Sequence, residues 1–419
     1  MVQYDFQEIK HQLQSNVGYY NTLDIEGFSQ MMKDPSYCYK FYWLEAIVQL
    51  ISEGKQEATY NEIIDEMISN AWYSVLEFHI HLSGVWGDGE IKDSLEKAVL
   101  KLHKLSELPN NASKVEIKNK IFEFAQELHE EKMILTQNVP YKALSGFANK
   151  YSEHIDLNSS AGRMMEYYNR MSGLESPLPY TFGDQKGLER KLIFHESWIQ
   201  MIQDNMVTIQ GWIRYEKVRW LQNNNPEVPG LVYKLTPLND KMRKLGHVRK
   251  LWESILEITS VIDVFKNEPI KNESYDVDHF IPWSFVMNDE LWNLMPMDSS
   301  LNSSKGNRLP QWDKFFIRFA QNQYIMYERI YEKPEIRKRY EACYRDNLHS
   351  IWASQELYRK GNSRENFYSI LEKNMRPVHD SARKQGYELW ILPNKGWVGE
   401  HSNPQNIKSS KRPDCTGNE

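Results

Sequence analysis

One short segment constrains this chain more than any other feature of its sequence. Asp278 and His279 stand side by side, and asparagines follow the histidine at fixed distances, with Asn293 14 positions later and Asn302 23 positions later. Lys305 comes three residues after the second asparagine. Carboxylate, imidazole and carboxamide groups are the side chains that hold a divalent ion and move a proton. The segment is therefore a candidate site, and it must fold into a compact unit that brings these groups together.

The residues around these positions predict two short strands and a helix. Tyr275 to Phe280 mixes aromatic, β-branched and acidic residues, which favours a strand that stops before the proline at 282. Phe285 to Trp292 is predicted as a loop, and Asn293 to Met297 as the second strand. Asp298 or Ser299 can cap a short helix that runs through Ser304 and ends where Gly306 and Pro310 interrupt it.

The spacing resembles the HNH nuclease motif, the ββα-metal fold, and is most similar to the HNH domain of the RNA-guided CRISPR effector nucleases, which also carries Asp-x-Asp-His at the strand end. The resemblance covers only a motif-length part of the 419 residues. It implies that His279 is the general base and that Asp278 and Asn302 are metal ligands. It also implies that Asn293 orients the histidine or its loop, and that Lys305 contacts phosphate.

The ligand set implied by the resemblance favours a hard cation. The last motif letter is asparagine here rather than histidine, so the metal would meet a carboxylate and an amide oxygen, which suit one Mg²⁺ or Mn²⁺ ion better than Zn²⁺. Asp276 lies two residues before Asp278 and would face the same side of a strand, so it is an alternative ligand. The three cysteines, Cys38, Cys343 and Cys415, are far apart and indicate no structural zinc.

The charge balance argues that any nucleic-acid contact is local. The formal net charge is −6, which does not fit a protein that coats DNA. A helix predicted to begin at Thr236-Pro237 carries a basic side next to the motif, and Arg308 follows the motif. The basic side has two readings of equal weight, a phosphate-contacting surface or a solvated helix face; its residues are Lys241, Arg243, Lys244, Arg249 and Lys250.

The whole chain is predicted to be mainly α-helical and multi-domain, with the ββα-metal unit embedded in it. Apolar residues from Phe41 to Ile51 recur at helical spacing, Gly54 ends that helix, and Thr59 with Glu62 forms a capping box for the next. This pair is an ordinary helical pair or, by a loose resemblance, a winged-helix-like segment. The predicted divisions are a helical domain at 1–170, a linker at 171–187, a helical block at 188–270, the HNH unit at 271–312, a helical buttress at 313–400, in which Glu365 completes a capping box, and a disordered tail at 401–419.

The sequence also bears on location. No run of 18 apolar residues is present, and the N-terminus lacks a basic start followed by an apolar run, so neither a membrane span nor a signal peptide is predicted. Free cysteines far apart suit a reducing cytoplasm, which is the expected compartment.

The resemblance implies a metal-dependent endonuclease, with DNA as the expected substrate. One active unit makes one cut, so a double-strand break would need a homodimer or two events. Family analogy further implies a restriction or anti-phage setting, including proteins paired with an ATPase. Two alternatives stay open: an RNA-cleaving toxin of the same fold, and a catalytically silent nucleic-acid-binding or scaffold protein. The role of the first 170 residues, as sensor, interface or DNA clamp, is open as well.

Overall fold

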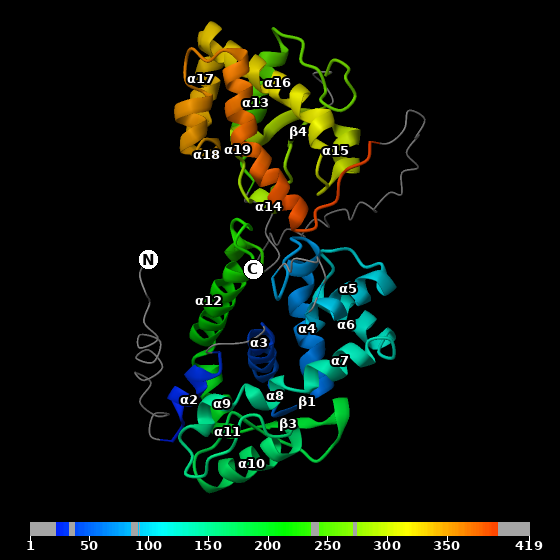
Figure 1. The fold of residues 1–419 in the computed structure, drawn as a ribbon, viewed down its shortest axis with the longest axis vertical. Coiled ribbons are helices and arrows are strands. Elements are labelled where there is room, and N and C mark those ends of the chain that lie inside the picture. The colour runs from blue at the N-terminus through cyan, green and yellow to red at the C-terminus, as the bar shows by residue number, and fades with distance from the viewer. Residues whose placement is uncertain are drawn as a thin grey trace, which may run out of the picture.

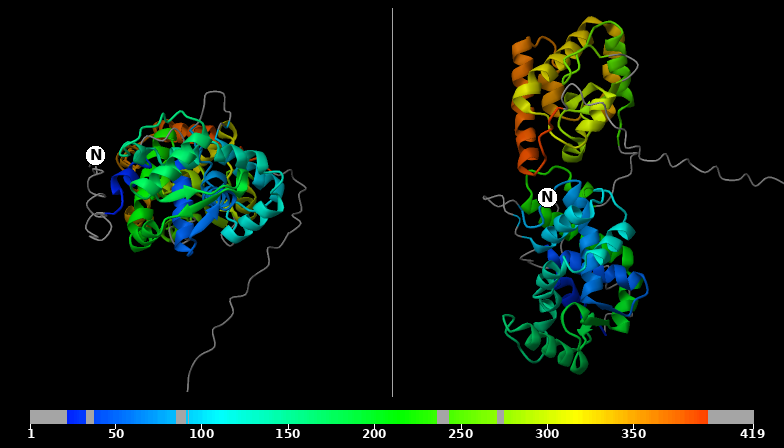
Figure 2. Two further views of the ribbon diagram at one scale, coloured as in Figure 1. Left: turned by 90° about the horizontal axis from the view of Figure 1, so that it is seen from below. Right: turned by 90° about the vertical axis from the view of Figure 1, so that its right-hand side faces the viewer.

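The protein has two hydrophobic cores. A computed structural model describes residues 22–32, 38–84, 91, 93–235, 243–270 and 275–392. Within these residues the buried apolar side chains gather in one cluster from Leu23 to Leu235 and another from Val248 to Trp390. We call these parts the N-terminal and C-terminal domains. They form the lower and upper lobes in Figure 1, and Figure 2 shows the same separation from another side.

The N-terminal domain is a set of helices with one small sheet. In its described residues the strands β1, β3 and β2 pair antiparallel in that order. The strands are β1 (Glu57–Thr59), β2 (Tyr180–Phe182) and β3 (Lys191–Phe194). The helices are α2 (Ile25–Gln30), α3 (Tyr39–Ser52), α4 (Tyr60–Leu76), α5 (Ser94–Ser106), α6 (Lys114–Glu123), α7 (His129–Thr136), α8 (Val139–Lys142), α9 (Ser145–Ala148), α10 (Ala161–Leu174), α11 (Glu196–Asp204) and α12 (Met206–Asn224).

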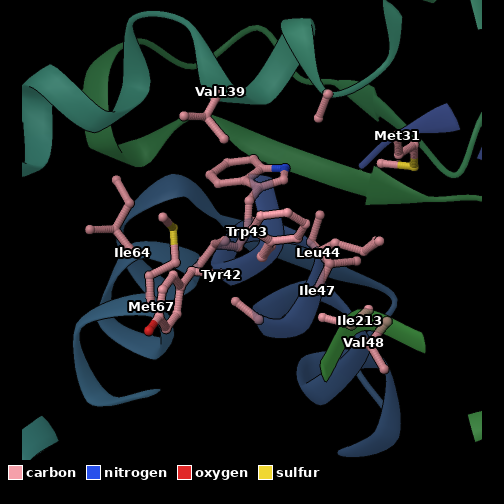
Figure 3. Close-up of a cluster of buried hydrophobic side chains, with 14 of the residues drawn as sticks. Met31, Tyr42, Trp43, Leu44, Ile47, Val48, Ile64, Met67, Val139 and Ile213 are labelled. Atoms are coloured by element: carbon pink, nitrogen blue, oxygen red, sulfur yellow. The ribbon is translucent and has the colours of Figure 1, made fainter. Parts of the chain in front are cut away.

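Helices α3 and α4 form the centre of this domain. Figure 3 shows Trp43 of α3 and Met67 of α4 among its buried side chains, and both are 0 % exposed. The predicted capping box is confirmed, because the Thr59 hydroxyl accepts from Glu62 N while the Glu62 carboxylate accepts from Thr59 N. Gly54 has φ +86°, a value that a side chain resists, so α3 ends just before it.

The predicted linker at 171–187 differs from the structure. Helix α10 continues to Leu174, and strand β2 then pairs with β3 inside the N-terminal domain. Leu178 and Tyr180 are both 0 % exposed. The glycines and prolines of this segment turn the chain between packed elements rather than separating two domains. The two cores instead part between Leu235 and Val248.

The C-terminal domain holds the candidate site among helices. Its strands are β4 (Tyr275–His279) and β5 (Leu294–Asp298). Its helices are α13 (Gly246–Leu256), α14 (Trp283–Val286), α15 (Ser299–Lys305), α16 (Trp312–Glu332), α17 (Pro334–Ala342), α18 (Tyr344–Asn347) and α19 (Arg364–Lys384), with single helical turns at Leu291–Asn293 and Ala353–Leu357. None of the helices in the described part of the chain combines the length and hydropathy that a membrane span requires.

Three predictions in this domain need correction. Residues 285–292 are not simply a loop, because α14 and a helical turn occupy half of them. The basic helix α13 begins at Gly246 rather than at Thr236, and residues 236–242 lie outside the described residues. Helix α19 is capped by Ser363, which accepts from Asn366 N, so Glu365 does not complete a capping box. Residues 393–419, including the predicted disordered tail, also lie outside the described residues.

A buried lysine joins the two domains. Lys234 is 0 % exposed, and its Nζ donates to the carbonyl oxygen of Phe285 in α14 at 2.6 Å. The ammonium also lies 5.6 Å from the ring centroid of Phe78 and 5.1 Å from that of Phe285. Nearby, Gln385 Nε2 donates to the carbonyl oxygen of His79 at 2.6 Å. Burial lowers the pKa of Lys234 from 10.5 to about 7, because the apolar surroundings disfavour the charged form.

We expect the free energy of unfolding to rise with pH between about 7 and 10.5 because of Lys234. In this window the unfolded chain binds a proton that the folded chain has released, so stability increases with pH. Lys234→Met should remove that rise, measured by urea unfolding at several pH values. Lys250→Met, at an exposed position on α13, serves as the control. An equal rise in Lys234→Met and in the unchanged protein would contradict this assignment.

Candidate active site

The site is built on strand β4, strand β5 and helix α15. The strands pair antiparallel with Tyr275 opposite Asp298 and His279 opposite Leu294. Asp298 then caps α15, because its side chain accepts from Ser300 N and Leu301 N. The strand, strand, helix order predicted from the sequence is therefore observed. It results from local signals, namely an alternating strand pattern and an N-cap acid that starts the helix.

An acidic face forms where α15 meets β4. Asp276 and Asp278 are the half-buried residues of β4, while the residues between and beside them are buried. Alternation along the strand places both carboxylates on one side. The side-chain amide of Asn302 donates to Asp276 Oδ2 at 3.2 Å. Two carboxylates and one carboxamide therefore meet on this face.

Lys305 is held inside the site rather than on its surface. It is 0 % exposed, and its Nζ lies 2.8 Å from Asp278 Oδ2. The predicted shared face of Asn302 and Lys305 is confirmed, because both reach β4 from α15. The predicted phosphate contact is not what this structure shows, since the ammonium is buried against Asp278. A buried lysine that binds a carboxylate neutralises the acidic face from within.

His279 lies on the other side of β4 from the acidic face. It is 1 % exposed and alternates with Asp278, so the two neighbours in sequence point to opposite sides. Its Nε2 lies 3.2 Å from the carbonyl oxygen of Asn288 and 3.1 Å from Asp289 Oδ1. The expectation that Asp278 and His279 act at one site stays a prediction, although adjacent strand residues direct their side chains to opposite sides.

The contacts of His279 determine where its ring carries hydrogen. A backbone carbonyl oxygen and a carboxylate oxygen are both acceptors, so the ring nitrogen between them must donate. This assigns the hydrogen to Nε2, and the neutral ring then has its lone pair on Nδ1. Nδ1 is the atom of His279 that can accept a proton.

Asn293 fixes the chain that follows His279. Its side-chain Oδ1 accepts from Ile281 N at 2.8 Å, and its Nδ2 donates to the carbonyl oxygen of Ile281 at 2.8 Å. Its own carbonyl oxygen accepts from Phe280 N at 2.8 Å. Asn293 is 0 % exposed. The side chain thus replaces a strand partner for Ile281, the second residue after β4, and it holds the loop rather than contacting the imidazole.

We expect Asn293→Ala to destabilise the protein by about 2–5 kcal/mol, because it leaves a buried N–H and a buried carbonyl of Ile281 without partners. Urea unfolding measures this loss. Asn119→Ala, at an exposed position on α6, is the matched control and should change stability by less than about 0.5 kcal/mol. A cost for Asn293→Ala no larger than that of the control would refute the structural role.

The basic residues reach the acidic face in one place. Arg249 of α13 has Nη2 3.6 Å from Asp276 Oδ1. Lys244 pairs with Asp346 at 2.7 Å, and the Arg243 guanidinium lies 4.9 Å from the Trp283 ring centroid. The predicted basic residues Lys250 and Arg308 are exposed, while Lys241 lies outside the described residues.

The donor set of the acidic face fits a hard divalent ion. Asp276, Asp278 and Asn302 offer only oxygen ligands, and Mg²⁺ commonly takes one or two carboxylates together with several waters. In the described residues no three His, Cys, Asp or Glu side chains are grouped to hold a metal, which leaves no enclosed all-protein cage there. Arg249 lies beside Asp276 and Lys305 pairs with Asp278, so the acidic face already attracts positive charge.

The sequence did not point to Asp289. This carboxylate lies between β4 and β5, contacts His279 and is 6 % exposed. No motif letter marks it, and its contact depends on how the loop folds back on the strand. Two adjacent acids, Asp289 and Glu290, in a segment rich in large apolar residues were the one available signal, because acids that become buried need partners.

Comparison with known proteins supports the sequence resemblance. Residues 263–311 match the HNH endonuclease family. This segment contains β4, β5 and α15 together with Asp289. No curated protein and no solved structure was found to match the chain.

Proposed function

We propose, on the premise that residues 263–311 match the HNH endonuclease family, that this protein is a metal-dependent endonuclease that hydrolyses phosphodiester bonds in DNA. The single observation that carries the proposal is the meeting of Asp276, Asp278 and Asn302 on one face, beside the strand that ends in His279. A nuclease acts on nucleic acid, which is the substrate that the family assignment implies.

The proposed roles follow from the contacts. Asp278, Asn302 and Asp276 are proposed to hold one Mg²⁺ or Mn²⁺ ion, which when bound would stabilise charge on the phosphate and on the leaving 3′ oxygen. His279 is proposed to take a proton from the attacking water at Nδ1, since Nε2 is already a donor. Asn293 holds the chain behind His279.

The buried His279 also implies motion before cleavage. Its side chain is 1 % exposed and lies across β4 from the acidic face. A side chain this deeply buried is closed to an attacking water, so we propose that the end of β4 changes conformation when substrate binds. The proposed phosphate contacts are the exposed basic residues near the site, of which Arg249 lies beside Asp276. The others are Arg243, Lys244, Lys250 and Arg308.

The proposal is tested by incubating the purified protein with supercoiled plasmid or total RNA, each with Mg²⁺, Mn²⁺ or a chelator. We expect nicked plasmid with either metal and none with chelator. Loss of RNA alone would favour the RNA-cleaving alternative. A retained gel shift without cleavage of either substrate would favour a binding or scaffold protein.

The wider setting is also a proposal. A restriction or anti-phage role predicts fewer plaques on cells that express the protein, with no protection from a His279→Ala variant. Linear plasmid that appears with second-order dependence on protein concentration would indicate a homodimer. Cleavage only in the presence of ATP and a second protein would indicate an ATPase partner.

A further inference from the structure

The partner of His279 is a second buried acid. Asp289 has a side chain only 4 % exposed, and its Oδ1 lies 3.1 Å from His279 Nε2. Within the described residues Oδ1 has no hydrogen bond of its own. A buried carboxylate oxygen without a donor is costly, and the ring N–H of His279 is the donor that lies beside it.

The other oxygen of Asp289 is held from a distant part of the chain. Its Oδ2 accepts from Lys244 N at 2.6 Å. Asn347, which is 0 % exposed, donates from Nδ2 both to the carbonyl oxygen of Lys244 at 2.9 Å and to that of Asp289 at 2.8 Å. The segment before α13 and the end of α18 therefore hold Asp289 in place, and the carboxylate cannot turn away from His279 without losing the bond from Lys244 N.

We propose that Asp289 is a positioning residue that fixes the orientation and tautomer of His279, an inference that rests on the endonuclease function proposed above. The carbonyl oxygen of Asn288 offers one acceptor to Nε2, and the carboxylate adds a second, charged one. Together they keep the hydrogen on Nε2 and the lone pair on Nδ1. The segments at α13 and α18 thus contribute to the site, because they fix Asp289, which in turn orients His279.

The first test follows the ring hydrogen directly in protein without substrate, by NMR of protein labelled with ¹⁵N-histidine. The His279 signals are identified by their absence in His279→Ala. We expect one tautomer with hydrogen on Nε2 and a slowly exchanging ring N–H. In Asp289→Ala the exchange with water should become faster by about tenfold or more, because the carboxylate oxygen that lies 3.1 Å from the ring nitrogen is lost.

Glu290→Ala is the matched control. Glu290 is the neighbouring buried acid, but its carboxylate accepts from His349 N and Ser350 N instead of His279. We expect a lower melting temperature for Glu290→Ala with an unchanged His279 ring signal. Asp289→Asn is the second variant, in case Asp289→Ala does not fold. Its side chain keeps one oxygen for the two donors, Lys244 N and His279 Nε2, so the exchange rate should be intermediate.

The second test is kinetic. We expect Asp289→Ala to lower kcat by about 10- to 100-fold, the range for loss of a carboxylate that orients a functional histidine, with KM changed much less. Unchanged ring signals in both Asp289 variants, or equal changes in Glu290→Ala, would overturn the proposal. The unaltered protein could show no cleavage while the His279 ring N–H still exchanges faster in Asp289→Ala. In that case the proposed endonuclease function is wrong and the positioning role of Asp289 stands.

Discussion

Replacing His279 with alanine is expected to lower the rate of cleavage by about 10² to 10⁴, the usual contribution of a positioned general base. The imidazole of His279 is the proposed proton acceptor, because its Nε2 faces two acceptor oxygens and leaves the lone pair on Nδ1. The measurement is the rate of plasmid nicking under single-turnover conditions at saturating Mg²⁺. Binding of DNA should change little, because the loss concerns the chemical step.

His349→Ala is the control for His279→Ala. His349 belongs to the same domain, and it is exposed, so its removal should leave nicking unchanged. The melting temperature of His279→Ala must be measured too, because the residue is buried and its loss leaves a small cavity. Full cleavage by a folded His279→Ala protein would assign the activity to another site or to a contaminant.

Replacing Asp278 with alanine is expected to affect cleavage and stability together. Cleavage should fall at least as far as in His279→Ala, because a proposed metal ligand is lost. The change also leaves the ammonium of Lys305, which is 0 % exposed, without its carboxylate at 2.8 Å. An uncompensated buried charge costs about 3–5 kcal/mol. Urea unfolding and metal-dependent nicking measure the two effects separately.

A double variant separates these two effects of Asp278. Asp278→Ala with Lys305→Met removes both charges of the pair, so most of the lost stability should return while cleavage stays absent. Asn302→Ala provides the converse case, with weaker metal-dependent cleavage and a smaller change in stability, because its amide makes a single contact with Asp276 at 3.2 Å. Recovery of cleavage in the double variant would exclude Asp278 as a metal ligand.

Much of the site's local structure could be predicted because it depends on short-range chemistry. The alternation of Tyr275 to His279 predicts a strand, and Asp298 starts α15 by accepting backbone N–H groups within its own first turn. The spacing of Asn302 and Lys305 predicts that they share a helix face, and both do reach β4. Patterns of this kind involve residues only a few positions apart, so no knowledge of the whole fold is needed.

Other features could not be predicted, because they depend on segments that are distant in sequence. Glycines and prolines at 171–187 indicate turns in any context, but only pairing of β2 with β3 shows that they lie within one domain. The length of Lys305 suits a surface contact as well as a buried one, and only the packing of α15 on β4 buries it. Lys234 likewise has no local signal for its contact with Phe285.

The sequence by itself determined the strand–strand–helix unit and the set of oxygen and imidazole groups it carries, because residue spacing and capping act along a few turns of chain. Only the tertiary structure decided how those groups are used. It placed His279 across β4 from the carboxylates, buried Lys305 against Asp278, and brought Lys244 and Asn347 to Asp289. The physical reason is that burial and long-range hydrogen bonding depend on which surfaces meet, and no short pattern records that.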